Sequence, residues 1–101
     1  MKYKVNFFNK GNRYHIYDYD YYPAKNGILI HFTVNEFECV RINKGGRSAD
    51  VKFFGYYRDK PPVDDNFYVG RETRKLNWVD GTIYVHIGNH DYPIGIYEVV
   101  D

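Results

Sequence analysis

Polar and apolar residues alternate along most of the chain, which is the pattern of half-buried β-strands. Near the N-terminus, KYKVNFFN places Tyr3, Val5 and Phe7 on one face and lysine or asparagine on the other. The same period of two recurs in RYHIY, residues 13–17. Between these segments KGN, residues 10–12, reads as a turn, so we expect the first two strands to form a hairpin.

The middle of the chain holds its most apolar segment, ILIHFTV, residues 28–34, which predicts a central strand. One face of this strand carries its apolar residues: Ile28, Ile30, Phe32 and Val34. The chain then either turns at residues 35–36 into FECVRI, residues 37–42, or continues as one long bent strand over residues 28–42.

Turn signals separate the strands that follow. NKGGRS, residues 43–48, predicts a flexible basic tip before the strand DVKFFGYY, residues 50–57, in which Gly55 indicates a bulge. RDKPPVDDN, residues 58–66, predicts an exposed loop because it holds two adjacent prolines and several charges. FYVG, residues 67–70, then predicts a short strand.

The clearest local signal is TRKLNWV-DG-TIYVHI, residues 73–87. Asp80-Gly81 stands between two β-rich runs, and a type I′ turn needs positive φ at both of its central residues. IGIYEVV, residues 94–100, predicts the last strand. Without a helical period anywhere, the chain is predicted to be all-β, one domain over residues 1–101, folded as an antiparallel sandwich or small barrel of about seven to eight strands joined by hairpins.

Composition adds one unusual feature, because 20% of the 101 residues are aromatic and 12 of them are tyrosines. A core of this size cannot enclose twelve phenols whose hydroxyls all need partners. The net charge of +1 gives no global field for nucleic acid or an anionic membrane. Cys39 is the single cysteine and no apolar run could span a membrane, so we expect a cytoplasmic protein with no membrane partner.

The densest aromatic stretch is YDYDYYP, residues 17–23, which runs into the loop signal PAKNG, residues 23–27. In an extended chain its residues divide by side: Tyr17, Tyr19 and Tyr21 on one, Asp18, Asp20 and Tyr22 on the other. Tyrosine recurs at interface hot spots, and carboxylates suit a basic partner. We expect these six residues to contact a protein partner; the alternatives are tyrosines that cover a thin core and sugar binding by stacked aromatics.

Nucleic acid is the alternative partner. Single strands bind to small β-barrels through cationic and aromatic side chains. The candidates here are Arg41, Lys44, Arg47, Arg71, Arg74, Lys75 and Trp78. Acidic residues interleave with these cations, which disfavours a groove that follows a phosphate backbone.

An internal similarity raises the question of a metal. HIYDYDYYP begins at His15 and HIGNHDYP begins at His86, which reflects either common turn residues or two similar loops at one end of the fold. If the loops meet, six potential ligands could converge: His15, Asp18, Asp20, His86, His90 and Asp91. Their spacing is not diagnostic, so we expect no metal and no cofactor.

Catalytic chemistry finds little support. Cys39 lies within a predicted strand, on the face of Phe37 and Arg41, where a buried inert thiol is expected. Ser48 stands on a flexible tip that positions nothing well. We expect no catalytic residue and a non-enzymatic protein-binding module, an inhibitor of a larger protein. Small inhibitors of phages and mobile elements, such as those that block host defence, offer an analogy of style without a shared motif.

Overall fold

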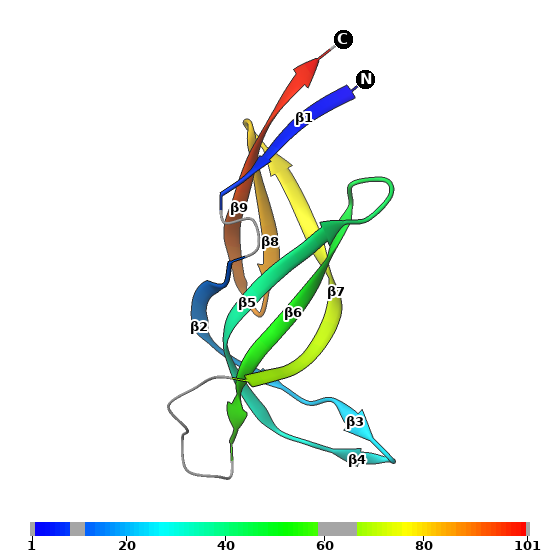
Figure 1. Ribbon diagram of the computed structural model, residues 1–101, viewed down its shortest axis with the longest axis vertical. Helices are drawn as coiled ribbons and strands as arrows, with labels where there is room; N and C mark the ends of the chain where they lie inside the picture. Colours follow the sequence, from blue (N-terminus) through cyan, green and yellow to red (C-terminus); the bar gives the residue numbers. More distant parts are fainter. Residues whose placement is uncertain (1, 9–11, 59–66, 101) are drawn as a thin grey trace.

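The structure is a computed structural model that describes residues 2–8, 12–58 and 67–100. These residues form nine β-strands and no helix (Figure 1). In chain order the strands are β1 (Lys2–Phe7), β2 (Tyr14–Tyr21), β3 (Ala24–Lys25), β4 (Ile28–Leu29), β5 (Phe32–Ile42), β6 (Ser48–Tyr57), β7 (Phe67–Val79), β8 (Thr82–Ile87) and β9 (His90–Val100). The predicted all-β class is confirmed.

Seven of the strands form one antiparallel sheet in the order β1-β9-β8-β7-β6-β5-β2. The sheet curls into an open half-barrel whose two edges are β1 and β2 (Figure 1). Strands β3 and β4 pair with each other and project from the end of the half-barrel that lies far from the start of β1 and the end of β9. The fold is therefore a partly closed barrel with an appended hairpin.

The hydrophobic core fills the concave side of the sheet. The alternation is most regular on β8, where Ile83, Val85 and Ile87 are buried and the residues between them are only partly buried. From β2, the Tyr21 side chain reaches across the interior to β7, because a Cβ atom on Gly70 would lie 2.3 Å from the Tyr21 hydroxyl oxygen. Two strands separate β2 from β7 in the sheet, so this contact requires the curl.

A bulge bends β5. Its register against β6 shifts between Val34 and Glu36, and an extra residue of this kind bends the strand and increases its twist. Gly55 of β6 lies opposite the bulge, where a Cβ atom would meet the Thr33 carbonyl oxygen at 2.0 Å. The irregularity predicted at Gly55 is therefore a close approach of β5, and the extra residue belongs to β5 rather than β6.

The bulges do not end the strands that contain them. Residues 35–36 do not form a turn, because β5 continues through its bulge from Phe32 to Ile42, as in the alternative of one long bent strand. The short strand expected at residues 67–70 is the beginning of β7. A bulge interrupts the alternation without ending the hydrogen-bonded ladder, so the sequence pattern alone resembles a turn.

The expected hairpin of the first two strands is wrong. β1 pairs with β9 over its whole length, whereas β2 pairs with β5, so the two strands lie at opposite edges of the sheet. In this position Val5 and Phe7 pack against the core. Turn residues show where a chain reverses but do not choose which strand is paired. Residues 9–11 and 59–66, which include parts of two predicted loops, lie outside the described residues.

Two tight hairpins have the geometry of type I′ turns. Asp80 and Gly81 have φ angles of 47° and 85°, which confirms the turn predicted between β7 and β8. Asn26 and Gly27 have φ angles of 54° and 77° and join β3 to β4. The segment PAKNG was expected to be a loop, yet its Asn-Gly pair is the signal that creates the projecting hairpin.

Candidate functional site

The Tyr/Asp stretch forms most of β2, and a register shift between His15 and Tyr19 divides its tyrosines. Tyr17 lies within the irregular segment and its side chain is 71% exposed, whereas Tyr19 and Tyr21 follow the segment and pack against the core. The expectation that all three share one face is therefore wrong. The bulge turns the side chain of Tyr17 outward while the two later tyrosines enter the half-barrel.

Tyr21 belongs to the core rather than to a contact surface. Its side chain is only 7% exposed, and its ring packs edge-on against Phe53 at a centroid distance of 5.2 Å. Burial, followed by the negative charge of Glu72, raises the pKa of the Tyr21 hydroxyl above its usual value. The sequence-based expectation of an exposed Tyr21 is corrected by this burial.

The residues of the opposite side remain accessible, but most are engaged. Asp20 accepts hydrogen bonds from Arg58 at 3.0 Å and contacts the His31 ring nitrogen at 3.1 Å. Tyr22 stacks on His31, with ring centroids 4.3 Å apart and planes at 17°. Asp18 is exposed and has no polar partner among the described residues. Of the two aspartates, only Asp18 offers an uncompensated carboxylate.

Among the described residues, the projecting hairpin presents the most exposed aliphatic side chains. Ile28 and Leu29 on β4 are each 67% exposed, and Tyr22 at the base of the hairpin is 52% exposed. These three residues are called the hairpin surface below. The sequence placed Ile28 on the inner face of a central strand, which is wrong, because the Asn26-Gly27 turn uses residues 28–29 to pair with β3 instead.

The two similar segments at His15 and His86 do meet. They lie on either side of the seam between β2 and the β8–β9 turn, which is not bridged by strand pairing within the described residues. The rings of Tyr17 and His90 lie 4.7 Å apart, and the Tyr17 backbone N–H donates to the Tyr92 hydroxyl at 3.2 Å. A seam cavity of about 320 Å³ is lined by Tyr17, Asp18, Tyr19, Asp20, Ile87, Gly88, Asn89 and His90.

This meeting does not assemble a metal site. Within the described ranges, no group of three or more histidine, cysteine, aspartate or glutamate side chains is placed to hold a metal ion. His86 and Asp91 pair with each other at 2.9 Å instead, as expected for a strand-end contact. The segments therefore share a place in the fold and line an open, tyrosine-rich seam between them.

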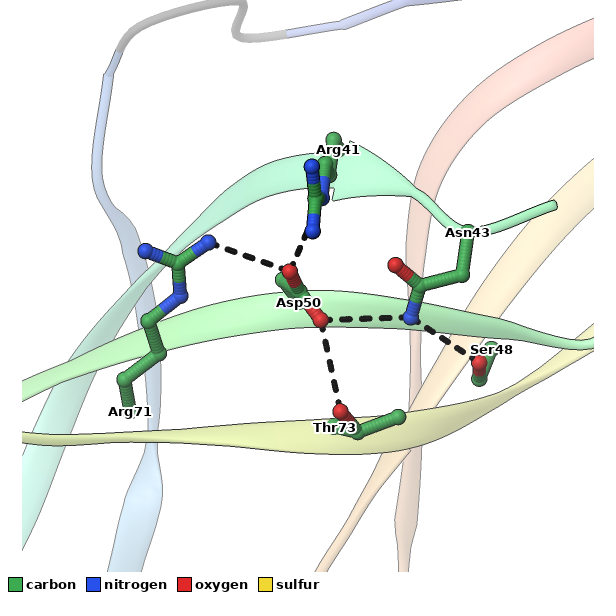
Figure 2. A network of polar contacts seen from close by, with 6 residues as sticks. All are labelled: Arg41, Asn43, Ser48, Asp50, Arg71 and Thr73. Carbon is green, nitrogen blue, oxygen red and sulfur yellow. Dashed lines mark hydrogen bonds and ion pairs between the residues drawn. The ribbon is translucent and has the colours of Figure 1, made fainter.

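The basic residues of the nucleic-acid alternative separate into three groups. The first lies on the outer face of the sheet, where Asp50 binds Arg41 at 2.9 Å and Arg71 at 3.0 Å (Figure 2). The other carboxylate oxygen accepts from Asn43 at 3.2 Å and from Thr73 at 3.3 Å. One carboxylate holds both guanidinium groups and offsets half of their charge, so these arginines are weaker phosphate ligands than an unpaired arginine.

The network fixes the charge of Asp50. Hydrogen bonds from Asn43 and then from Arg71 lower the pKa of the Asp50 carboxyl to about 2. A carboxylate with such a low pKa is a weak base at neutral pH. The cluster therefore ties β5, β6 and β7 together across the outer face through side chains from all three strands.

The second group, Arg74 and Lys75, is divided between the two faces of β7, and only Arg74 faces the interior. Arg74 forms an ion pair with Glu72 at 3.0 Å, and its Nε donates to the His86 backbone carbonyl at 3.2 Å. Lys75 lies on the other face of β7, opposite Ser48. Arg74 thus has structural partners, and Lys75 lies apart from it despite being its neighbour in the chain.

The third group lies at the β5–β6 tip, which packs against Trp78 of β7. The indole N–H of Trp78 donates to the Gly46 carbonyl oxygen at 2.6 Å. Arg47 lines the adjoining groove, and Lys44 is exposed on the same tip. The structure therefore brings together Arg47 and Trp78 from the alternative set, with Lys44 on the same tip but outside the lining of the groove, and adds two aromatic residues that the sequence did not indicate, Tyr3 and Tyr97.

Cys39 is partly buried, as expected for a structural thiol. Burial, and then the charges of Asp50 and Glu38, raise its pKa to about 11. A register shift between Cys39 and Arg41 places Arg41 on the outer face, so the two do not share a face as expected. A thiol with this pKa is protonated at neutral pH and is a poor nucleophile.

Comparisons with known proteins do not add a function. No family model matches the chain, no curated protein matches it, and no solved structure matches it. Over its described residues the chain forms no helix that could span a membrane. Two surfaces of the molecule can bear a function, the hairpin surface and the groove beside Trp78.

Proposed function

We propose that the protein is a non-enzymatic protein-binding module whose contact region is the hairpin surface. The observation that carries the proposal is the 67% exposure of Ile28 and Leu29 on a hairpin that projects from the sheet (Figure 1). Clustered apolar side chains of this kind mark interaction sites. Burial of each aliphatic side chain against a partner contributes about 1.5–3 kcal/mol before the cost of association.

The base of the hairpin adds polar and aromatic contacts. Tyr22 is held by its stacking on His31, so it loses little rotamer freedom when a partner covers it. Asp18 and the 71% exposed Tyr17 lie earlier on β2 and form the rim of the proposed contact region. Because Arg58 and His31 already bind Asp20, Asp18 is the carboxylate that steers a basic partner surface in this proposal.

The non-enzymatic part of the proposal is supported by the state of the candidate chemical groups. Cys39 has a raised pKa and Asp50 is held by four side chains, so both are occupied by structural roles. We further propose inhibition of a larger protein, in the style of phage or mobile-element inhibitors, because a small domain can cover a functional face of its partner. A cytoplasmic location completes the proposal, supported by the single free cysteine.

The test is affinity capture from source-cell extract followed by quantitative mass spectrometry, with wild type and matched variants. The variant Ile28→Ser/Leu29→Ser removes the apolar hairpin tip, and Ile96→Ser removes an exposed apolar residue of β9. We expect at least one protein that wild type and Ile96→Ser retain and the double variant loses. Equal capture by the folded double variant would refute the proposal. Inhibition is tested by adding each variant to the identified partner's own activity assay.

A further inference from the structure

A groove lies beside the β5–β6 tip. The tip itself is at the end of the half-barrel opposite the projecting β3–β4 hairpin (Figure 1). Its volume is about 430 Å³. Its walls come from β1, β7, β9 and the tip, and they consist of Tyr3, Gly45, Gly46, Arg47, Trp78 and Tyr97. Half of these residues are aromatic, and they derive from segments that are far apart in the sequence.

The three aromatic rings form a concave wall. Ring centroids of Trp78 lie 5.3 Å from Tyr3 and 4.9 Å from Tyr97, with interplanar angles of 49° and 63°. The three rings pack against one another and present one joint aromatic surface to the groove. Tyr3 is 49% exposed, so part of the wall is open to solvent and can stack on a planar ligand.

The tip is held in place by Trp78. Gly45 and Gly46 have φ angles of 95° and 72°, and the Gly46 carbonyl accepts the indole N–H of Trp78. A Cβ atom on Gly46 would lie 3.4 Å from the indole ring, so the tip backbone packs directly on it. The groove is therefore a preorganised feature, and Arg47 is positioned at its wall by the same tip.

Charge decides which ligand fits. Five of the six arginines form ion pairs with carboxylates: Arg13, Arg41, Arg58, Arg71 and Arg74. Among the described residues Arg47 has no carboxylate partner, and neither has Lys44 on the same tip. An aromatic cage alone suits a quaternary ammonium ion. The unpaired guanidinium of Arg47 instead repels a cation and attracts an anion at this wall.

We propose that the groove binds a nucleobase that carries a phosphate. The base stacks on the ring of Tyr3 within the wall formed with Trp78 and Tyr97, and the phosphate binds Arg47 and Lys44. An unpaired base can enter such a groove because its π-face is free, whereas a stacked base in a duplex cannot. The source is a single strand of nucleic acid or a free nucleotide, which share this chemistry. The proposal does not depend on the hairpin surface.

Trp78 is the single tryptophan, so its fluorescence reports directly on the groove. The probes are single-stranded oligothymidylate, its duplex with oligoadenylate, thymidine monophosphate and tetramethylammonium. We expect oligothymidylate to quench Trp78 and the duplex to quench it less. Tyr3→Ala should weaken binding about 5- to 140-fold, the range for loss of one stacked base. Arg47→Gln should weaken binding and lower the slope of log affinity against log salt by about one.

Matched controls separate the groove from general charge and aromatic content. Arg58→Gln removes an arginine that is paired with Asp20, and Tyr68→Ala removes an exposed tyrosine outside the groove. Both should bind as wild type does, and so should Ile28→Ser/Leu29→Ser. Comparable quenching by thymidine monophosphate identifies a free nucleotide as ligand, and quenching by the oligonucleotide alone identifies a strand; both support the groove.

Three results would overturn the inference. The first is unchanged Trp78 fluorescence with both the oligonucleotide and the mononucleotide. The second is an equal loss of binding in Arg47→Gln and Arg58→Gln, which would indicate nonspecific attraction to positive charge. The third is stronger quenching by tetramethylammonium than by the oligonucleotide, which would indicate a cation cage. Circular dichroism of each variant establishes that it is folded.

Discussion

The contact between Tyr21 and Gly70 predicts that Gly70→Ala destabilises the wild-type protein but stabilises a variant that lacks the Tyr21 ring. In wild type, an added Cβ atom on Gly70 would lie 2.3 Å from the Tyr21 hydroxyl oxygen and 2.4 Å from its ring. Tyr21 is buried and cannot move aside freely. Gly70→Ala should therefore destabilise the protein by about 1–3 kcal/mol, the usual cost of overpacking a core.

Removing the ring reverses this effect. Tyr21→Ala alone should cost about 3–5 kcal/mol, as for other buried aromatic residues. In that background the space above Gly70 is empty, and Gly70 is not among the glycines with positive φ. Gly70→Ala should then stabilise by about 0.4–1 kcal/mol, because alanine restricts the unfolded chain. The coupling free energy between the two sites is the difference, about 1.4–4 kcal/mol.

Urea unfolding of wild type, both single variants and the double variant, followed by circular dichroism, measures this cycle. Tyr21→Ala should lower the Tm by at least about 12 °C, at about 4–8 °C per kcal/mol, so the titrations are run well below room temperature. Tyr21→Leu provides a milder variant for the same cycle. Additive effects of the two substitutions, within about 0.5 kcal/mol, would refute the contact and with it the curl that brings β2 to β7.

Four further predictions concern single residues. The lowered pKa of Asp50 predicts that wild type loses part of its free energy of unfolding as pH falls from about 4 to about 2. Acid-unfolding curves of Asp50→Asn should lack this contribution at neutral pH and therefore lack this loss. Cys39 should react with iodoacetamide far more slowly in the folded than in the unfolded protein at neutral pH. Its raised pKa also predicts that the free energy of unfolding falls as pH rises from about 9 to about 11, and that Cys39→Ser abolishes this fall. Gly81→Val should lower the Tm, because a β-branched residue is strained at a φ of 85°. Tyr17→Ala should change the free energy of unfolding by no more than about 0.5 kcal/mol in urea titrations, because its side chain is largely exposed.

The strands and tight turns could be predicted because their causes are local. The alternation in residues 82–87 became β8 with Ile83, Val85 and Ile87 buried, and Asp80-Gly81 became the predicted turn. These features depend on backbone torsions and on the period of side-chain direction within a few residues. The Asn26-Gly27 pair is a local turn signal of the same kind and could have predicted the exposed hairpin, but the apolar residues 28–34 after it were predicted to form a central strand.

The candidate sites could be predicted only in part. Of the six residues in the Tyr/Asp stretch, Tyr17, Asp18 and Tyr22 are exposed without an ion pair, whereas Tyr21 is buried because a bulge shifts the face of the strand. Trp78 was a candidate from its type alone. No sequence signal joins it to Tyr3 and Tyr97, because these residues meet only when β1 pairs with β9 at the edge of the curled sheet.

The sequence by itself determined that this chain forms β-strands, where most of them lie, and two of its turns, because alternation and positive φ are properties of short segments. Tertiary structure decided that β1 joins β9 rather than β2, that Tyr21 crosses the interior to Gly70, and that Arg47 alone among the arginines has no carboxylate partner within the described residues. These outcomes depend on the burial of apolar surface and the pairing of charges between segments distant in the chain. These contacts form, and contribute to the free energy of folding, only when the sheet is curled.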